Sequence, residues 1–588
     1  MQNIKTNILI VGGGPSGMVA ALCLAKYNID SIIVEKYLDI NPHPKAHELN
    51  TRSIEILKEI GISIKDLELE ASPSSDGCRI AFCTDIQNEF GQIDLSKDIN
   101  DPEKYKRHVE SEQPYLNISQ TEIEKVLRSK ITNNPFIQIL TGHEWMSCEQ
   151  TDGVIYNKVQ NLDKNKICEI HSEWLLAADG ANSSIRNSLG IKMKGPGFIG
   201  SFVNAYFEKD LRKYIYKPAK LYWIVNPSAP GVFIAHHIDK RWVYNFPIYE
   251  PWEKIEDINE ELLEQRIKDA LGIEDLDIKI KSVSIWKMTQ QTAESWRDKN
   301  IFLIGDAAHC FPPTGGLGMN SGIADAHNLC WKIAESQSLK NSDILLDSYE
   351  IERKPVIEKN GKESFENYEK FFEVFEALGL PKNGPEKIAK FKASLVMKII
   401  PKSLRKIIIN KLNDFANKKI NSSITNANLK IQQTIKEQIP HFDRIGLDLG
   451  YIYDDKATIK NNLTPKESTV TEYLPSFLPG ARFPHMWLNF NQTISSHTLI
   501  TYRKWTLICM NENDLNYFNI DLQPECLNMV LLSDLKIDFQ FLNEFIKFAD
   551  MDKLGLMLIR PDGHIALRAL PNKDNKNILT NYFEGIGF

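Results

Sequence analysis

A glycine-rich turn between a buried strand and a helix lies near the start of the chain. Residues 8–11 (ILIV) are uniformly apolar, as in a parallel strand that is covered on both faces. Gly12, Gly14 and Gly17 then form G-x-G-x-x-G, and residues 18–27 continue with helical spacing. This order of strand, glycines and helix predicts an α/β fold built on a Rossmann-like unit.

An acidic residue follows this unit at an informative distance. A second apolar strand, residues 31–34, leads into Glu35, which lies 23 residues after Gly12. A carboxylate about 20 residues after the first glycine binds the ribose of an adenine dinucleotide, and the glycine turn holds its pyrophosphate. We therefore expect a bound dinucleotide rather than a turn without a ligand. NAD and FAD remain open here, because both contain ADP.

A second glycine-rich stretch, residues 305–320 (GDAAHCFPPTGGLGMN), separates the two ligands. Its glycines permit positive φ and close approach of a ligand, and its prolines stiffen the loop. The helix that follows offers free amides and a positive dipole end, and Asp306 can accept hydrogen bonds from hydroxyl groups. No second G-x-G-x-x-G unit is present. The stretch favours FAD, a long ligand with hydroxyl groups and a polar ring.

Composition bounds the remaining possibilities. A chain of 588 residues exceeds one hydrophobic core, so two or three domains are expected. The net charge of −7 argues against a nucleic-acid partner. Nine cysteines without a C-x-x-C pair predict neither a metal site nor disulfides, and they favour a cytoplasmic location. Glycines interrupt the apolar residues 8–25, so we expect no membrane-spanning segment.

Three motifs, in order along the chain, resemble one protein family. They are ILIVGGGPSGMVAALCLA, LLAADGANSSIRNSLG and IFLIGDAAHCFPPTGGLGMNSGIADAHNLCWKIA. Together they resemble the group A flavin-dependent aromatic hydroxylases, which have the p-hydroxybenzoate hydroxylase fold. Farther along, LLDSYEIERKPV, LPGARFPHMWL and LMLIRPDGHIALR resemble the longer members: phenol 2-monooxygenase, 2,4-dichlorophenol 6-monooxygenase and the polyketide hydroxylases.

The resemblance and the residue patterns imply a division into domains. The short aromatic runs after residue 200 predict an antiparallel sheet over the flavin, with about half of its seven candidate rings turned away from the ligand. Cys509 and Cys526 are far apart in sequence, so the C-terminal domain is expected to serve packing or oligomerisation, and a homodimer stays open. We predict an FAD-binding domain (1–190 and 285–360), a substrate-binding β-sheet domain (191–284), a helical connecting region (361–435) and a thioredoxin-like α/β domain (436–588).

The same resemblance implies which residues hold FAD. Asp179 and Gly180 are placed near the pyrophosphate, and Gln120 near the ribityl chain. Lys45 stands where family members commonly have arginine; it keeps the charge without the planar fork, and Arg52 is a candidate to share its task. The expected FAD-binding residues are Gly12, Gly14, Pro15, Ser16, Gly17, Glu35, Lys36, Lys45, Arg52, Gln120, Asp179, Gly180, Asp306, Pro313, Gly316, Gly318, Met319 and Asn320.

The implied reaction is hydroxylation of a phenolic ring. NADPH or NADH reduces FAD, O₂ forms a flavin C4a-hydroperoxide, and one oxygen atom is transferred to the ring. One alternative is the same chemistry on a polycyclic polyketide or an antibiotic of the tetracycline or rifamycin type. Another is an FAD-binding assembly or regulatory protein without oxygenase activity. Candidates for the group that ionises the substrate are His47, Tyr244, His236 and Lys287, and Pro313 is expected to face the substrate.

Residues 387–419 form a basic segment, with ten Lys or Arg residues and one acid, Asp414. Two interpretations are open. A basic amphipathic helix can bind a membrane surface or a partner. We favour the other, a solvated connecting helix whose apolar stripe is covered by the neighbouring domain.

Overall fold

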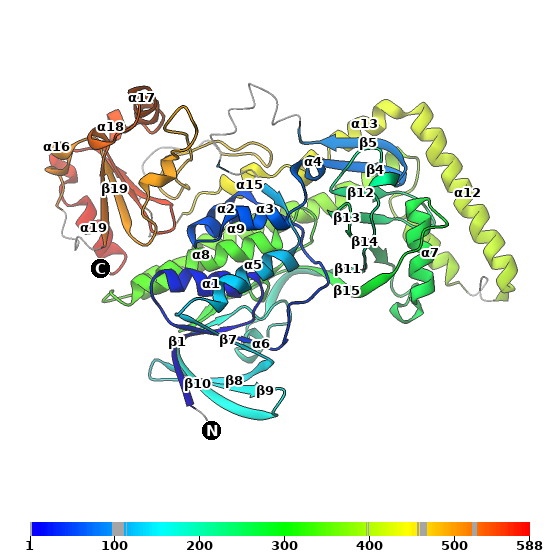
Figure 1. Cartoon of the computed structure of the whole chain (residues 1–588), viewed down its shortest axis with the longest axis horizontal. Helices are drawn as coiled ribbons and strands as arrows, with labels where there is room; N and C mark the ends of the chain where they lie inside the picture. The colour runs from blue at the N-terminus through cyan, green and yellow to red at the C-terminus, as the bar shows by residue number, and fades with distance from the viewer. Residues whose placement is uncertain are drawn as a thin grey trace.

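A largely parallel sheet carries the N-terminal glycine turn (Figure 1). The computed structural model describes residues 3–96, 111–112, 115–394, 397, 399–454, 458, 467–519 and 526–588. The sheet has the order β16-β17-β10-β1-β2-β7, and the antiparallel strands β8 and β9 extend it from β10. Its strands are β1 (Asn3–Val11), β2 (Ser31–Glu35), β7 (Ile137–Thr141), β8 (His143–Thr151), β9 (Val154–Asn161), β10 (Lys166–Ala177), β16 (Arg297–Asp298) and β17 (Ile301–Leu303).

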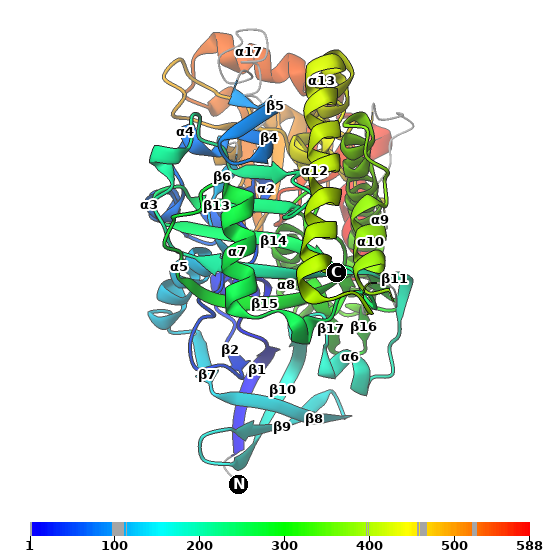
Figure 2. The ribbon, with the colours of Figure 1, turned by 90° about the vertical axis from the view of Figure 1, so that its right-hand side faces the viewer.

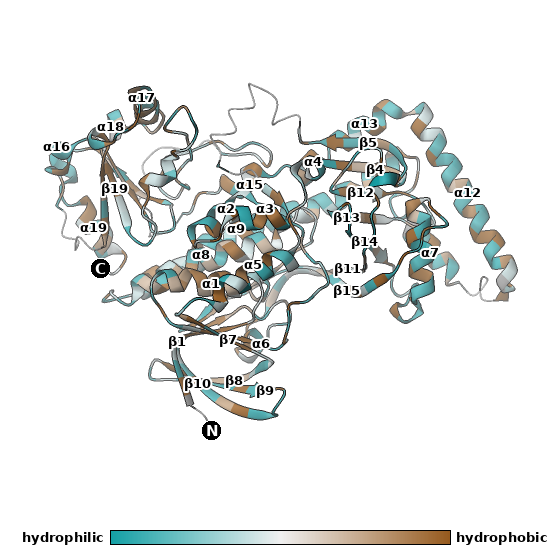
Figure 3. Cartoon of the chain, in the orientation of Figure 1, coloured by the Kyte–Doolittle hydropathy of each residue, from teal (hydrophilic) through white to brown (hydrophobic). Residues whose placement is uncertain are grey.

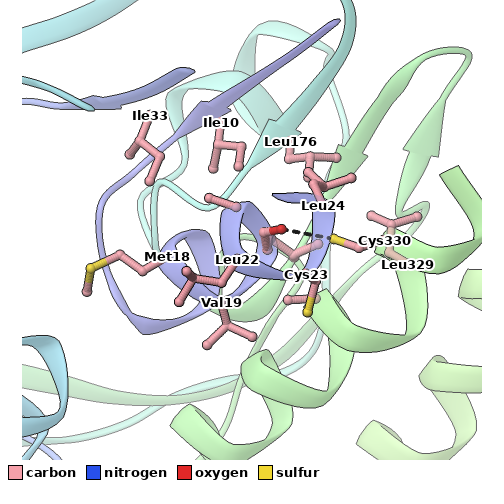
Figure 4. Packing of buried hydrophobic residues seen from close by; sticks show 14 of the residues in the cluster. Ile10, Met18, Val19, Leu22, Cys23, Leu24, Ile33, Leu176, Leu329 and Cys330 are labelled. Atoms are coloured by element: carbon pink, nitrogen blue, oxygen red, sulfur yellow. Dashed lines mark hydrogen bonds between the residues drawn. The ribbon is translucent and has the colours of Figure 1, made fainter. Parts of the chain in front are cut away.

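Two helices that are distant in sequence pack together on this sheet: α1 (Pro15–Lys26) and α8 (Gly318–Ser336). Figure 4 shows the apolar side chains of α1 between the strands and α8, where the Cys330 thiol donates to the carbonyl oxygen of Ala20 at 3.5 Å. A Cβ at Gly322 of α8 would overlap with Ser16 Oγ. The glycine therefore lets the two glycine-rich stretches of the sequence approach each other.

The second sheet stands beside the first and has the order β18-β15-β11-β14-β13-β12-β4-β5 (Figures 1 and 2). Neighbouring strands are antiparallel except β12 and β4, which are parallel. The sheet includes β4 and β5, which come from within residues 1–190, and it therefore draws on more of the chain than the predicted range 191–284. Its strands are β4 (Arg79–Asp85), β5 (Asn88–Asp94), β11 (Met193–Phe207), β12 (Leu221–Ile224), β13 (Gly231–His237), β14 (Arg241–Ile248), β15 (Ile280–Ala293) and β18 (His309–Cys310).

The two faces of the second sheet have different surroundings. Leu263, Ile267 and Leu271 of α7 (Glu260–Leu271) form a core cluster with one face. Strand alternation places four of the seven candidate rings in that cluster and three on the opposite face, close to the predicted half. The four are Tyr222, Phe233, Trp242 and Tyr244; the three are Tyr206, Trp223 and His236.

Helices connect this sheet to the C-terminal domain. The long α9 (Asp343–Ala377) packs against α8, and α13 packs against α9 and β5. In Figure 1, α12 projects at one end of the longest axis of the molecule. The helices of this region that follow α9 are α10 (Gly384–Lys392), α12 (Lys402–Asn426) and α13 (Asn428–Lys436).

The C-terminal domain has a thioredoxin-like arrangement, as predicted. Its sheet has the order β20-β19-β21-β22; β19 and β20 are parallel, and β21 is antiparallel to both of its neighbours. Neither Cys509 nor Cys526 forms a disulfide bond within the described part of the chain. The strands are β19 (Trp505–Cys509), β20 (Leu527–Leu531), β21 (Leu556–Ile559) and β22 (Ile565–Ala569), and the main helices are α17 (Phe539–Phe548) and α19 (Ile578–Gly585).

A buried ionic network joins the C-terminal domain to the first domain. Arg560 donates to both carboxylate oxygens of Glu352, at 2.5 and 3.0 Å, and it also pairs with Asp562. Lys332 of α8 donates to the same Glu352. Burial alone would raise the pKa of Glu352, but Arg560 and Lys332 hold it at about 2. The ions compensate each other, so the interface is fixed by specific pairs and not only by apolar packing.

Candidate active site

The first glycine turn has the geometry of a pyrophosphate cradle. Gly12 has a φ of +109°, and a Cβ there would overlap with the carbonyl oxygen of Ala178 on the neighbouring strand connection. A Cβ at Gly17 would overlap with the carbonyl oxygen of Gly12. At Gly14, in contrast, no heavy atom lies within 4 Å of the Cβ position. Gly14 is the N-cap residue of α1, so no side chain occupies the amides at the start of this helix. The open amides at this end of α1 fit an anionic ligand.

Glu35 ends β2 beside this turn. Its Oε2 accepts from the Gly13 amide at 2.7 Å, and its Oε1 accepts from the Tyr37 amide at 2.9 Å. The carboxylate is half-buried, and each oxygen can accept a further hydrogen bond from a ribose hydroxyl. Lys36 beside it is exposed, and its amine lies over the ring of Tyr37, 5.1 Å from the ring centroid.

The stretch around Asp179 lies against the turn. Gly180 has a φ of +83° and open space at its Cβ position. Asp179 Oδ2 accepts from the Ile185 amide at 3.1 Å, whereas its buried Oδ1 has no partner among the described residues. Burial raises the pKa of Asp179. An unpaired buried acceptor is costly, so this oxygen fits a site that a ligand or a bridging water completes.

Arg186 connects this stretch to the second cradle. Its guanidinium donates to the carbonyl oxygens of Ala181 and Ala307, both at 2.9 Å. Asp306, next to Ala307, is exposed, while Gly305 and Ala307 on both sides are buried. The chain therefore presents the Asp306 carboxylate outward from a fixed loop, as a hydrogen-bond acceptor for ligand hydroxyl groups would require.

Buried hydrogen bonds of Asp325, a residue that the sequence analysis did not single out, support that loop. Asp325 of α8 accepts from the Gly305 amide at 3.2 Å and from His309 Nε2 at 2.6 Å. Arg353 of α9 donates to its other oxygen at 2.9 Å. Burial would raise the pKa of Asp325, but His309 and Arg353 hold it below its ordinary value. The only signal in the sequence was an acid within an otherwise apolar helical pattern.

The start of α8 completes the cradle. No heavy atom lies within 4 Å of the Cβ position of Gly318, and the first hydrogen bond of the helix runs from the Ser321 amide to the carbonyl oxygen of Leu317. The three preceding amides, of Gly318, Met319 and Asn320, are thus available to a ligand. The Asn320 side chain serves the protein instead, since it donates to the carbonyl oxygens of Glu48 and Gly316.

Taken together, two open glycine turns, an unpaired buried carboxylate oxygen and two uncapped helix starts fit FAD. Lys45 is exposed, and its positive charge acts on Asp306. Gln120 lies beside the loop that holds Lys45, because the backbone amide of Gln120 donates to the carbonyl oxygen of Ala46. The contacts of Lys45 and Gln120 with FAD stay predictions.

The prediction that Arg52 helps to hold FAD is corrected. Arg52 is buried, and its guanidinium donates to Glu55 and to the carbonyl oxygen of Asp562.

The second sheet turns the face opposite α7 toward this cradle. His43, in the loop after β2, contacts Ser282 and Ser284 of β15 through its two ring nitrogens, at 2.7 and 2.8 Å. Farther along the loop, the rings of His47 and His236 meet edge to face, with centroids 5.9 Å apart. The loop therefore fixes which face of the sheet borders the cofactor.

Strand alternation excludes two of the residues predicted to ionise the substrate, Tyr244 and Lys287. Tyr244 is fully buried in the cluster with α7 and donates its hydroxyl to the carbonyl oxygen of Ala229. Lys287 lies an odd number of positions from Ser282 and Ser284, so its exposed side chain points away from the His43 face. Pro313 is exposed, but its carbonyl oxygen accepts from the Gly316 amide, and its position relative to a substrate stays a prediction.

His47 and His236 remain as candidates on the correct face. His236 is 2% exposed, and neither of its ring nitrogens has a partner among the described residues. Burial lowers the pKa of His236 well below its usual range, and burial also lowers the pKa of His47. Both rings are therefore neutral at pH 7, and they present nitrogen atoms that can accept or donate a hydrogen bond.

A buried ion triad beside His47 was not anticipated. Glu48 accepts from Lys220, which directly precedes β12 of the second sheet, at 2.9 Å and from Arg444 at 2.8 Å. Arg444 Nη2 also lies 3.6 Å from the Cβ position of Gly316 in the second cradle. The triad therefore joins the sheet, the His47 loop and the cofactor loop. Its members are far apart in sequence, and no local pattern pairs them.

Comparison with known proteins agrees with this geometry. The chain is 25% identical over 595 residues to 2,4-dichlorophenol 6-monooxygenase of Delftia acidovorans, covering 96% of this chain and 95% of that protein. It is 29% identical over 378 residues to tetracenomycin A2 monooxygenase-dioxygenase of Streptomyces glaucescens, covering 60% and 66%. The flavin-dependent monooxygenase PieE, solved with FAD and substrate, has the same fold: its TM-score is 0.80, at 24% identity over 99% of both chains.

These findings confirm the resemblance and the cofactor predicted from the sequence motifs. The protein is an FAD-dependent monooxygenase with NADPH or NADH as co-substrate. Residues 5–364 match the family model described as the FAD binding domain, and the chain belongs to that family.

Proposed function

We propose that the protein hydroxylates an aromatic compound bearing a ring hydroxyl group, and that His47 and His236 bind this hydroxyl. The observation that carries the proposal is the paired histidines on the sheet face that borders the cofactor cradle. Similarity to a dichlorophenol monooxygenase over nearly the whole chain supports a phenolic substrate.

The hydrogen bonds of His47 indicate how it would act. The Asn117 amide group is oriented because its Nδ2 donates to the carbonyl oxygen of Ala235, at 3.1 Å. Its Oδ1 then faces His47 Nδ1 at 3.2 Å and accepts a hydrogen bond from it. A neutral imidazole with its proton on Nδ1 has a free lone pair on Nε2. His47 Nε2 can therefore accept the proton of a phenol and raise the nucleophilicity of the ring.

The cofactor side has complementary tasks. Bound FAD, reduced by NADPH or NADH, supplies the activation of O₂ for oxygen transfer. The uncapped start of α8 would stabilise negative charge on the ring system, and Asp306 would bind ribityl hydroxyl groups. The sheet face with Tyr206 and His236 would exclude water from the reaction.

A second candidate substrate keeps the same chemistry. Similarity to a tetracenomycin monooxygenase-dioxygenase favours a polycyclic polyketide or antibiotic in place of a simple phenol. The alternative of an FAD-binding protein without oxygenase activity is set aside, because the chain belongs with monooxygenases along nearly its full length.

The experiment is an oxidation assay on the purified yellow protein. NADPH or NADH oxidation and H₂O₂ release are followed with a panel of phenols and polycyclic aromatic compounds, and products are identified by mass spectrometry. Oxidation that one phenol stimulates with little peroxide supports the proposal. Stimulation by polycyclic compounds alone would favour the second candidate, and stimulation without any hydroxylated product would contradict both.

We also propose a cytoplasmic location and a homodimer. The nine cysteines form no disulfide bond among the described residues, as is usual in a reducing compartment. Two-fold dimers are the commonest assemblies of soluble chains. Sedimentation of the purified protein gives the number of chains, and a monomer over the whole concentration range would exclude the dimer.

A further inference from the structure

The basic segment 387–419 lies mainly on α10 and α12, at the far end of the second sheet from the first domain (Figure 1). It contains ten Lys or Arg residues and the single acid Asp414; Lys398 lies outside the described residues. Among the described residues, no helix is long and apolar enough to cross a membrane. Any contact of this segment with lipid would therefore be at a surface.

Large apolar side chains of α12 are exposed. Leu404 and Ile407 are each 50% exposed, Leu412 is 39% and Phe415 is 70% exposed. At 100° per residue these four lie on one side of the helix, and the buried Asn413, Ala416 and Ile420 lie on the other. In Figure 3 the ribbon of α12 has brown, apolar residues among teal ones. The stripe with Ala416 and Ile420 is therefore covered, with Ile420 in a core cluster, whereas the four apolar side chains on the opposite side are exposed.

Lysines accompany these apolar residues. Lys411, Lys418 and Lys419 are exposed, and by helical spacing they lie on the same side as the apolar four. Ile399, just before the helix, is 83% exposed. Exposed apolar residues with lysines among them form a basic and apolar surface, which fits a helix that lies against an anionic membrane. We call Leu404, Ile407, Leu412, Phe415 and these three lysines the α12 surface.

We propose that the α12 surface binds anionic lipid, so that the enzyme attaches reversibly to a membrane whose surface is negative. The apolar side chains would enter the boundary between headgroups and acyl chains, and the lysines would contact the headgroups. A second copy of the chain fits this surface less well. A two-fold interface would place the lysines of one copy against the same lysines of the other, and their charges would repel. The inference does not depend on the reaction that the enzyme catalyses.

Flotation of the FAD-loaded protein with vesicles tests the proposal. Vesicles of phosphatidylcholine alone are compared with vesicles that contain phosphatidylglycerol, at low and at high salt. Binding is expected only to the anionic vesicles, and salt should weaken it. Neutralising Lys411, Lys418 and Lys419 to glutamine should weaken binding strongly, because each lysine near such a surface contributes roughly fivefold.

Apolar variants separate insertion from charge attraction. Ile407→Ser with Phe415→Ser should also reduce binding, whereas the control Phe539→Ser should not, since Phe539 is 78% exposed on α17 in the C-terminal domain. An unchanged flavin spectrum reports that each variant folds. No binding to anionic vesicles, or equal binding by the α12 variants, would overturn the proposal. So would self-association that Phe415→Ser abolishes, because the surface would then be a contact between copies.

Discussion

His47 and His236 meet edge to face with ring centroids 5.9 Å apart, one from the loop after β2 and the other from β13. Asn117 holds His47 in place, and nothing among the described residues holds the ring nitrogens of His236. This pair joins the first domain to the second sheet at the face where a substrate would lie. It is also the most direct place to test the proposed reaction.

Replacing His47 with glutamine should slow phenol hydroxylation by about 100-fold, the effect of losing a general base. Because burial lowers the pKa of His47, the ring is neutral at pH 7 and becomes protonated only in acid. The wild-type rate should thus fall only at a pH below the ordinary histidine pKa of 6.5, and the variant should lose this dependence. The pH profile of product formation is measured. His237→Gln, in the next position of the strand, is the control; an unchanged profile in His47→Gln would dismiss the base.

Replacing Asp306 with alanine should weaken FAD binding by about 10- to 100-fold, the cost of losing hydrogen bonds to a charged acceptor. The carboxylate is exposed on a loop that Arg186 and Asp325 fix from behind, so the fold should persist. Flavin fluorescence during titration of the apoprotein gives the affinity. A variant that stays fully yellow through dialysis would remove Asp306 from the cofactor site.

Two alanine substitutions in the first glycine turn should have different effects. Gly12→Ala strains a φ of +109° and overlaps a carbonyl group, so it should destabilise the protein by about 2–5 kcal/mol. Gly14 has a φ of −77° and open space, so Gly14→Ala should preserve the melting temperature of the apoprotein while lowering FAD affinity. Calorimetry and flavin titration separate the two effects. Equal FAD affinity in Gly14→Ala would mean that the open space is not part of the cradle.

Replacing Arg560 with methionine should destabilise the protein by about 3–5 kcal/mol, because Glu352 is left buried without its main partner. The pKa of Glu352 is about 2 in the folded protein, below its ordinary value of 4.5. The stability from this group is thus complete above pH 4.5 and is lost as the pH falls toward 2. Denaturant unfolding at several pH values measures both effects. Lys354→Met is the control, because its pair with Glu350 is partly exposed.

Local features of the sequence were sufficient for the cofactor and the family. Short segments of the sequence were enough to identify the glycine turn, Glu35 and the stretch 305–320. Each was recognised from residue spacing, from the periodicity of strands and helices, or from glycines that adopt positive φ. The thioredoxin-like domain could likewise be predicted from its motifs, and its strand order agrees.

Only the tertiary structure decided the substrate side and the supports of the cradle. Strand alternation was visible in the sequence, but the contact between His43 and Ser282 decides which face of the second sheet borders the cofactor. Because of this contact, His236 stays a candidate for binding the substrate and Tyr244, on the opposite face, does not. The pairing of Asp325 with Arg353 likewise joins two helices. Such contacts depend on where distant segments meet, and a pattern read along one segment carries no information about the other.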